Sequence, residues 1–185
     1  MHGPQTRVSD GARSSSTHAR WRWLLDAVGA ADPLVAAGLL HDAVERTATT
    51  PSDLTLRFGD VVAMPVAAVT GQRSMRRYRK RKAALRERAT TSGEPAAILF
   101  AADKIAKVRQ YRQQLEQSVH GCAPPRRRRL HHYTESLLSL EAVIRHPPLV
   151  RTLRRELSPL TPLPARPEVV TVLRTGSDAA LSTDS

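Results

Sequence analysis

The sequence LVAAGLLHDAVERT, from Leu34 to Thr47, organises the rest of the chain around one helix. Asp32 is the expected N-cap of this helix and Pro33 its first residue. One side of the helix is apolar at helical spacing and is expected to face the core; it carries Val35, Leu39, Leu40 and Val44. This pattern predicts a buried helix.

A polar group interrupts the apolar pattern of this helix. His41 and Asp42 are adjacent, and Glu45 follows four residues after the histidine, so all three fall within about one helical turn. Such groups are costly to bury without partners, and histidine mixed with carboxylates is a typical ligand set for a divalent cation. The pattern leaves two interpretations open: a metal site, or a satisfied core histidine beside solvated acids.

The charge of the chain is strongly positive. There are 29 Lys and Arg residues against 17 Asp and Glu residues, which gives a formal net charge of +12 over 185 residues. This field attracts nucleotides and other polyanions. All but four of the cations are arginine, in a chain rich in alanine and proline, which is also what coding bias alone produces. The charge therefore does not predict nucleic-acid binding.

Two other features restrict the class of protein. Cys122 is the only cysteine, which excludes an intrachain disulfide and a zinc site built from cysteines. No apolar run approaches the roughly 20 residues that span a bilayer, and the N-terminus lacks the apolar core of a signal peptide. We expect no membrane association and a cytoplasmic location.

Helical spacing recurs along the chain without any alternating strand pattern, so the expected fold is an all-α bundle. Further helices are expected at about His18–Val28, Thr50–Phe58, Asp60–Thr70, Glu94–Gln117, Leu130–Ile144 and Leu149–Leu157. Gly29 is the expected C-terminal cap of the helix His18–Val28, and Pro65 is expected to bend the helix Asp60–Thr70. One domain is expected over residues 1–157, and a disordered tail over residues 158–185, where the apolar pattern ends.

Two further polar residues lie in apolar surroundings. His18 falls on the inward side of its helix; it is either a ligand or a helix-start histidine without that role. Asp103 interrupts the run AILFAADKIAKV and needs a partner, which is Lys104 or Lys107 in a structural interpretation and a metal in a functional one.

The basic run from Arg73 to Arg88 is either a solvated face or a dedicated anion site. His131 and His132 have only Glu135 at ligand spacing, and we expect both histidines at the surface.

Several separated pieces of the sequence resemble one known family. The opening His2-x-x-Gln5-x-Arg7, with Gly11 and His18 after it, is followed by LLHDAVERTATTPSDLTLRFGDVVAMPVAAVTG and then by AADKIAKV. In this order, over about residues 1–112, they resemble the HD-domain metal-dependent phosphohydrolases. The similarity is greatest to the (p)ppGpp hydrolase domain of RelA/SpoT-type proteins and of small free-standing alarmone hydrolases. The resemblance implies an HD-domain helical bundle.

The resemblance also implies roles for single residues. His18, His41, Asp42 and Asp103 fall on the metal-ligand positions, with manganese (Mn²⁺) as the usual metal. Glu45 falls on the carboxylate that positions or deprotonates the attacking water. The positions near the nucleotide substrate and its phosphates are those of Arg7, Lys104 and Lys107.

The chain departs from the family pattern at several of these positions. Arg46 stands beside Glu45 where the family has a second acid of the catalytic site, Lys107 replaces a signature asparagine, and Ala19 replaces the proline after the first histidine. The family helix that precedes His2 has no counterpart. Two functions therefore remain: a manganese-dependent hydrolase of (p)ppGpp or a related nucleotide phosphate, and a degenerate HD domain that binds a nucleotide or a partner with weak or no catalysis.

Overall fold

The computed structural model describes residues 22–71, 75–117, 126–144 and 147–164. Residues 22–26 are helical and end in a turn at Gly29, whose φ of +65° confirms its expected role as the cap. The other helices are α2 (Asp32–Arg46), α3 (Pro51–Phe58), α4 (Asp60–Val69), α5 (Tyr78–Thr91), α6 (Glu94–Gln117), α7 (Arg126–Val143) and α8 (Pro147–Leu157). These residues contain no strand, so the predicted all-α fold is confirmed.

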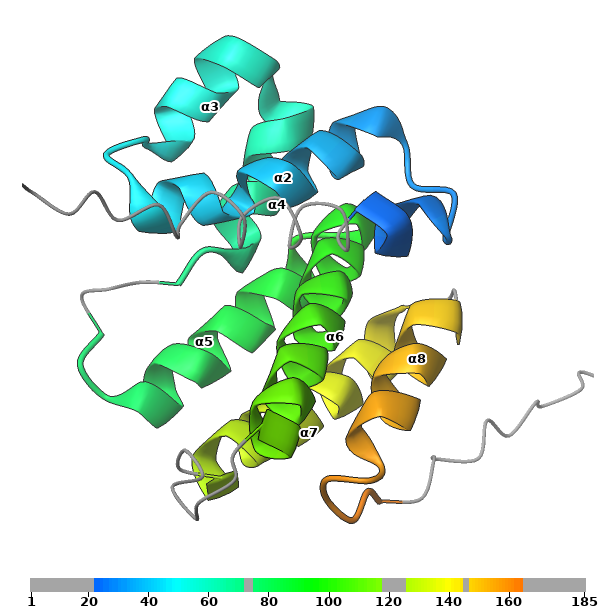
Figure 1. Ribbon diagram of the computed structural model, residues 1–185. Helices are drawn as coiled ribbons and strands as arrows, with labels where there is room; N and C mark the ends of the chain where they lie inside the picture. Colours follow the sequence, from blue (N-terminus) through cyan, green and yellow to red (C-terminus); the bar gives the residue numbers. More distant parts are fainter. Residues whose placement is uncertain (1–21, 72–74, 118–125, 145–146, 165–185) are drawn as a thin grey trace, which may run out of the picture.

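The long helix α6 forms the centre of the bundle and packs against α2, α4, α5, α7 and α8 (Figure 1). Its buried positions include many alanines, and small side chains let neighbouring helices approach closely. The fully or almost fully buried ones are Ala96, Ala97, Ala101 and Ala102. Helix α6 begins and ends at the residues that the sequence predicts.

Helix α2 packs on α4 and touches α6 with a face that differs only in part from the predicted one, because Val35, Leu40 and Val44 are partly buried against the core as expected. Leu34, Ala37, Gly38 and His41 are the buried positions of this face, whereas Leu39 is 40% exposed. The expectation that Leu39 faces the core is therefore wrong. The contact surface runs through the small residues and places His41 inside. The helix also begins one residue earlier than expected, because the carbonyl of Ala31 accepts its first hydrogen bonds, from the amides of Leu34 and Val35.

Helices α3 and α4 pack against each other, and α4 also packs on α2. Thr50 and Asp53 cap α3 reciprocally, with Thr50 Oγ1 accepting from the Asp53 amide at 3.2 Å and Asp53 Oδ2 accepting from the Thr50 amide at 2.8 Å. This confirms the predicted start of α3. Arg88 of α5 donates to the carbonyls of Ala68 and Thr70 at the end of α4. One arginine of the basic run thus has a structural role.

The C-terminal part also differs from the prediction. Helix α7 begins at Arg126, four residues before the expected start. Arginine is a good helix former, and the exposed side chains of residues 127–129 remain in water, so a run of charge does not prevent the helix. The described chain continues past Leu157 to residue 164, and Leu160 and Leu163 pack against the core. The rest of the expected tail lies outside the described residues. No described helix is long and apolar enough to cross a membrane.

An ion-pair cluster attaches α8 to α6. Glu156 accepts from Arg109 Nε at 2.9 Å and from Arg112 Nη1 at 2.8 Å, and its side chain is only 12% exposed. We expect Glu156→Gln to lower the free energy of unfolding by about 1–2 kcal/mol at this partly screened site, because the amide accepts through one oxygen only and therefore loses one of the two hydrogen bonds together with the carboxylate charge. Urea denaturation measures this loss. Glu116→Gln, an exposed change on the same α6, is the control, and equal losses in both variants would contradict the prediction.

Candidate functional site

His41 is held in one orientation by its own helix. The side chain is 8% exposed, and Nδ1 donates to the carbonyl of Gly38 at 2.7 Å. Because a carbonyl oxygen can only accept, Nδ1 carries the proton and Nε2 is directed at two carboxylates: Asp42 Oδ1 at 2.9 Å and Asp103 Oδ1 at 3.7 Å. Burial lowers the pKa of His41, but the hydrogen bond to Asp42 and the charges of both carboxylates outweigh it, and the pKa is raised. We call His41, Asp42 and Asp103 the His–Asp cluster.

Asp103 brings α6 into this cluster and is paired with two lysines. Lys104 Nζ contacts Asp103 Oδ2, and Lys107 Nζ lies 2.8 Å from Asp103 Oδ1. Burial would raise the pKa of Asp103, but Lys104, Lys107 and His41 hold it far below its usual value. Lys104 is 1% exposed and its Nζ lies 4.2 Å from the centre of the Phe100 ring. Its burial outweighs the attraction of Asp103 and lowers the pKa of Lys104 to about 8. Both lysines that the structural interpretation offers as partners of Asp103 therefore contact it.

Arg46 contacts the remaining carboxylate of the cluster. Its Nη2 lies 3.1 Å from Asp42 Oδ2, one helical turn away, and its side chain is 75% exposed. The hydrogen bond from His41 is the largest cause of the lowered pKa of Asp42, and Arg46 and Lys107 add to it. Each carboxylate of the cluster therefore contacts a cation, Arg46 at Asp42 and Lys107 at Asp103. Both cations stand at positions where the sequence departs from the family pattern.

The donor chemistry of the cluster suits a divalent metal. An imidazole whose Nδ1 proton is held by a backbone carbonyl presents Nε2 as a ligand, and two carboxylates complete a set suited to Mn²⁺. Within the described residues, however, no three His, Cys, Asp or Glu side chains form a group that could hold a metal ion by themselves. The predicted fourth ligand, His18, lies outside the described residues, so the metal remains a prediction.

Other predicted site residues also fall beyond what the structure describes. Arg7 precedes the described part of the chain. Glu45 lies on α2 one turn after His41, but its side chain is not among those described. The structure thus brings together six of the predicted residues: His41, Asp42, Arg46, Asp103 and the two lysines that follow it on α6, with Lys104 adjacent and Lys107 one turn on.

A pocket of about 400 Å³ lies beside the cluster, between α5, α6 and α7. Lys104 and Lys107 belong to its wall and also contact Asp103, so the two lysines join the pocket to the cluster. The rest of the wall is basic, amide or aromatic: Tyr78, Arg81, Lys82, Gln110, Tyr111, Gln114, Arg129, His132 and Tyr133. Tyr111 Oη is buried and has no hydrogen-bond partner among the described residues. We call this cavity the lysine pocket.

His132 is the residue that the sequence prediction missed. The expectation for His131 is confirmed, since it is exposed, but His132 is only 4% exposed. Helix α7 packs against α5, α6 and α8. Adjacent residues of a helix point in different directions, so His132 faces the neighbouring helices while His131 faces solvent. Burial, followed by the charges of Lys104 and Lys82, lowers the pKa of His132 to about 2.

This buried histidine predicts a pH dependence of stability. Its pKa lies below that of the unfolded chain, so between about pH 2 and 6.5 the unfolded chain binds the extra proton and stability falls as the pH drops. We expect the wild type to lose up to about 1.4 kcal/mol more per pH unit than His132→Gln below pH 6. Urea denaturation at pH 5, 6, 7 and 8 measures this difference. Parallel pH profiles of the two proteins would contradict it.

Comparisons with known proteins add to this geometry. No protein-family model matches the sequence, and neither does any curated protein. Among solved structures, the crystal structure of lmo0812 from Listeria monocytogenes EGD-e matches with a TM-score of 0.70 and 24% identity, over 85% of this chain and 99% of that one. A metazoan ortholog of SpoT, described as hydrolysing ppGpp, matches with a TM-score of 0.61 and 22% identity, over 78% of this chain and 79% of that one. The chain therefore shares its helical fold with lmo0812 and with the SpoT ortholog.

Proposed function

We propose that this chain is a metal-dependent phosphohydrolase that removes the 3′-pyrophosphate of (p)ppGpp or of a related nucleotide. One observation carries the proposal: His41 Nε2 of α2 faces the carboxylates of Asp42 and Asp103, and the lysine pocket opens beside them. The ppGpp hydrolysis described for the SpoT ortholog of the same fold supports this substrate class.

The metal, which we expect to be Mn²⁺, would be held by His41, Asp42 and Asp103 together with His18. When bound, it supplies a Lewis acid that polarises a phosphoryl oxygen and acidifies water. The protein's own contribution starts at Gly38, whose carbonyl fixes the tautomer of His41. Glu45 lies one turn further along α2, and we assign it the role of positioning the attacking water and taking its proton.

The lysine pocket supplies the features that a nucleotide substrate requires. Lys104 and Lys107 place positive charge between the pocket and the cluster, which suits the phosphates next to the reacting bond. Tyr111 Oη is a buried hydroxyl without a partner among the described residues, and a polar substrate group would satisfy it. The amides of Gln110 and Gln114 and the ring of Tyr78 add hydrogen-bonding and stacking surface for a base or sugar.

A second candidate function is a degenerate domain of the same fold that binds nucleotide with weak or no catalysis. Arg46 on Asp42 and Lys107 on Asp103 favour it, because these cations occupy the carboxylates that a metal requires. The two candidates share the pocket and differ in whether the cluster binds a metal.

Hydrolysis of ppGpp by the purified full chain tests the proposal. With Mn²⁺ present, we expect GDP and pyrophosphate to form, and we expect EDTA and His41→Ala each to abolish their formation. Glu45→Gln should lower kcat with little change in KM, since it removes the base and leaves the pocket intact. Product formation that survives EDTA and His41→Ala would refute the proposal, and nucleotide binding without turnover would favour the degenerate domain.

A further inference from the structure

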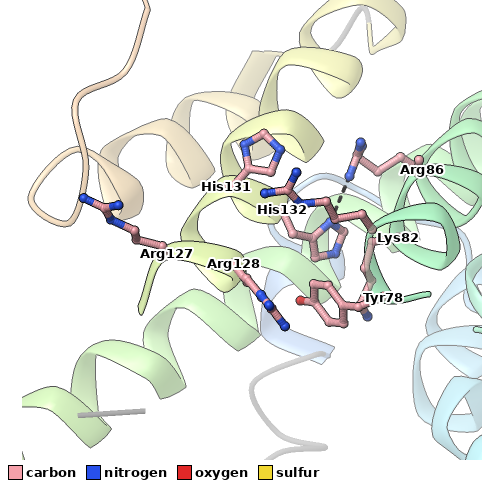
Figure 2. Close-up of a pocket in the computed structure, with 9 residues that line it drawn as sticks. Tyr78, Lys82, Arg86, Arg127, Arg128, His131 and His132 are labelled. Atoms are coloured by element: carbon pink, nitrogen blue, oxygen red, sulfur yellow. Dashed lines mark hydrogen bonds between the residues drawn. The ribbon is translucent and has the colours of Figure 1, made fainter. Parts of the chain in front are cut away.

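A second basic pocket lies between α5 and α7, and none of its lining residues belongs to the His–Asp cluster. Its volume is about 300 Å³. Figure 2 shows the side chains of Tyr78, Lys82 and Arg86 from α5 and of Arg128 and His132 from α7 around it. Arg127 also lines the pocket but points away from the other labelled side chains. We call this cavity the α5–α7 pocket.

The α5–α7 pocket concentrates positive charge from two helices. Arg79, Lys82, Arg86 and Arg128 line it, and Glu135 is an acid at its edge, 4.0 Å from Arg86 Nη2. The described lining of the cavity contains no acid, so the field in the cavity favours an anion with more than one negative charge. Arginine guanidinium groups match the oxygen atoms of phosphate in a forked geometry, and the Tyr78 ring adds an apolar surface beside them.

His132 supplies an observation that is independent of the charge. Arg86 Nη1 lies 3.2 Å from His132 Nδ1, and a guanidinium can only donate, so Nδ1 accepts and Nε2 carries the proton. This Nε2–H group is buried and has no hydrogen-bond partner among the described residues. A buried donor without an acceptor is unfavourable, and it points to an acceptor that the described residues do not provide. In Figure 2 the ring of His132 lies between Arg86 and the side on which Tyr78 and Lys82 are found.

We propose that the α5–α7 pocket is a second anion site, which binds a small molecule carrying phosphate groups. Arg86 orients the His132 ring, Nε2–H donates to a phosphate oxygen, and Arg128 and Lys82 neutralise the charge from opposite helices. Tyr78, Lys82 and His132 also line the lysine pocket, so they form a shared wall between the two cavities. This site does not depend on the proposed hydrolysis, since none of the His–Asp cluster belongs to it.

Pyrophosphate titration of the full chain in EDTA tests the site by calorimetry. We expect Arg128→Glu to weaken pyrophosphate binding by roughly tenfold or more, because a facing cation becomes an anion. Arg151→Glu, the same change at an exposed position of α8, is the matched control and should leave the affinity unchanged. Lys107 lines the lysine pocket and not the α5–α7 pocket, so Lys107→Ala should weaken only the pyrophosphate binding that Arg128→Glu leaves intact.

A second measurement follows the proton of His132 directly. In the chain labelled with ¹⁵N-histidine, the Nε2–H signal that is missing from His132→Gln should be present in the free protein and shift on addition of pyrophosphate. An unmoved signal would overturn the proposal, as would pyrophosphate binding that Lys107→Ala abolishes and Arg128→Glu leaves intact. A short single-stranded RNA that binds Arg128-dependently and is not displaced by pyrophosphate would assign the pocket to a nucleic acid and also overturn it.

Discussion

Asp103→Asn is expected to lower the free energy of unfolding by about 3 kcal/mol, the lower end of the cost of breaking a buried ion pair. The substitution keeps the size of the side chain but removes the charge that Lys104 and Lys107 share. Lys107 is 43% exposed and can turn to water, whereas Lys104 is 1% exposed and cannot. The lowered pKa of Lys104, about 8, lets it release its proton, which keeps the cost at the lower end. Urea denaturation in EDTA measures the change without any contribution from a metal.

Two variants show whether the buried lysine is the cause. Asp103→Asn combined with Lys104→Met removes both charges, and we expect it to recover at least half of the lost stability, because no unpaired group remains. Asp26→Asn, at an exposed ion pair with Arg22, is the control and should cost less than about 0.5 kcal/mol. An Asp103→Asn protein as stable as this control would show that the ion pair between Asp103 and Lys104 contributes little to stability.

Arg46→Asp is expected to bind Mn²⁺ about tenfold more tightly than the wild type, a change of about 1.4 kcal/mol. The guanidinium contacts Asp42, one of the proposed ligands, and its replacement by an acid removes a positive charge and adds a negative one beside the metal site. The expected change in Mn²⁺ affinity is small because the Arg46 side chain is 75% exposed and therefore screened by water. Turnover of ppGpp at limiting Mn²⁺ should rise by a similar factor.

A different role for Arg46 predicts the opposite result. If the guanidinium binds a substrate phosphate, Arg46→Asp raises KM and lowers turnover even when Mn²⁺ is saturating. Arg151→Asp, the same change on α8, controls for the net charge of the protein. Comparing kcat and KM at limiting and saturating Mn²⁺ therefore distinguishes an arginine that competes with the metal from one that binds substrate.

The ends of several helices could be predicted because local chemistry determines them. Thr50 and Asp53 cap α3 with their own side chains, and Gly29 adopts a backbone conformation that other residues rarely adopt. Leu39 could not be placed in this way, because its exposure depends on which face of α2 the bundle covers. The start of α7 at Arg126 was missed for a related reason: a run of arginines looks like a loop but is compatible with an exposed helical turn.

The candidate site was predictable only in part. His41 and Asp103 are far apart in sequence, and the resemblance to a family linked them before the structure placed their side chains 3.7 Å apart. The contact between Arg46 and Asp42 follows from their spacing of four residues on one helix. The burial of His132 and the two basic pockets required the packing of α5, α6 and α7, which no local pattern specifies.

The account depends on the His–Asp cluster being a metal site, and a titration with Mn²⁺ tests this most directly. Free Mn²⁺ gives a strong electron paramagnetic resonance signal, which decreases when the ion binds to protein. We expect the metal-free full chain to bind about one Mn²⁺ and to melt at a higher temperature with it, since a ligand of the native state stabilises that state. His41→Gln should bind none and melt at the same temperature with or without Mn²⁺. A wild type that leaves all Mn²⁺ free, or a His41→Gln variant that binds it equally well, would contradict the account.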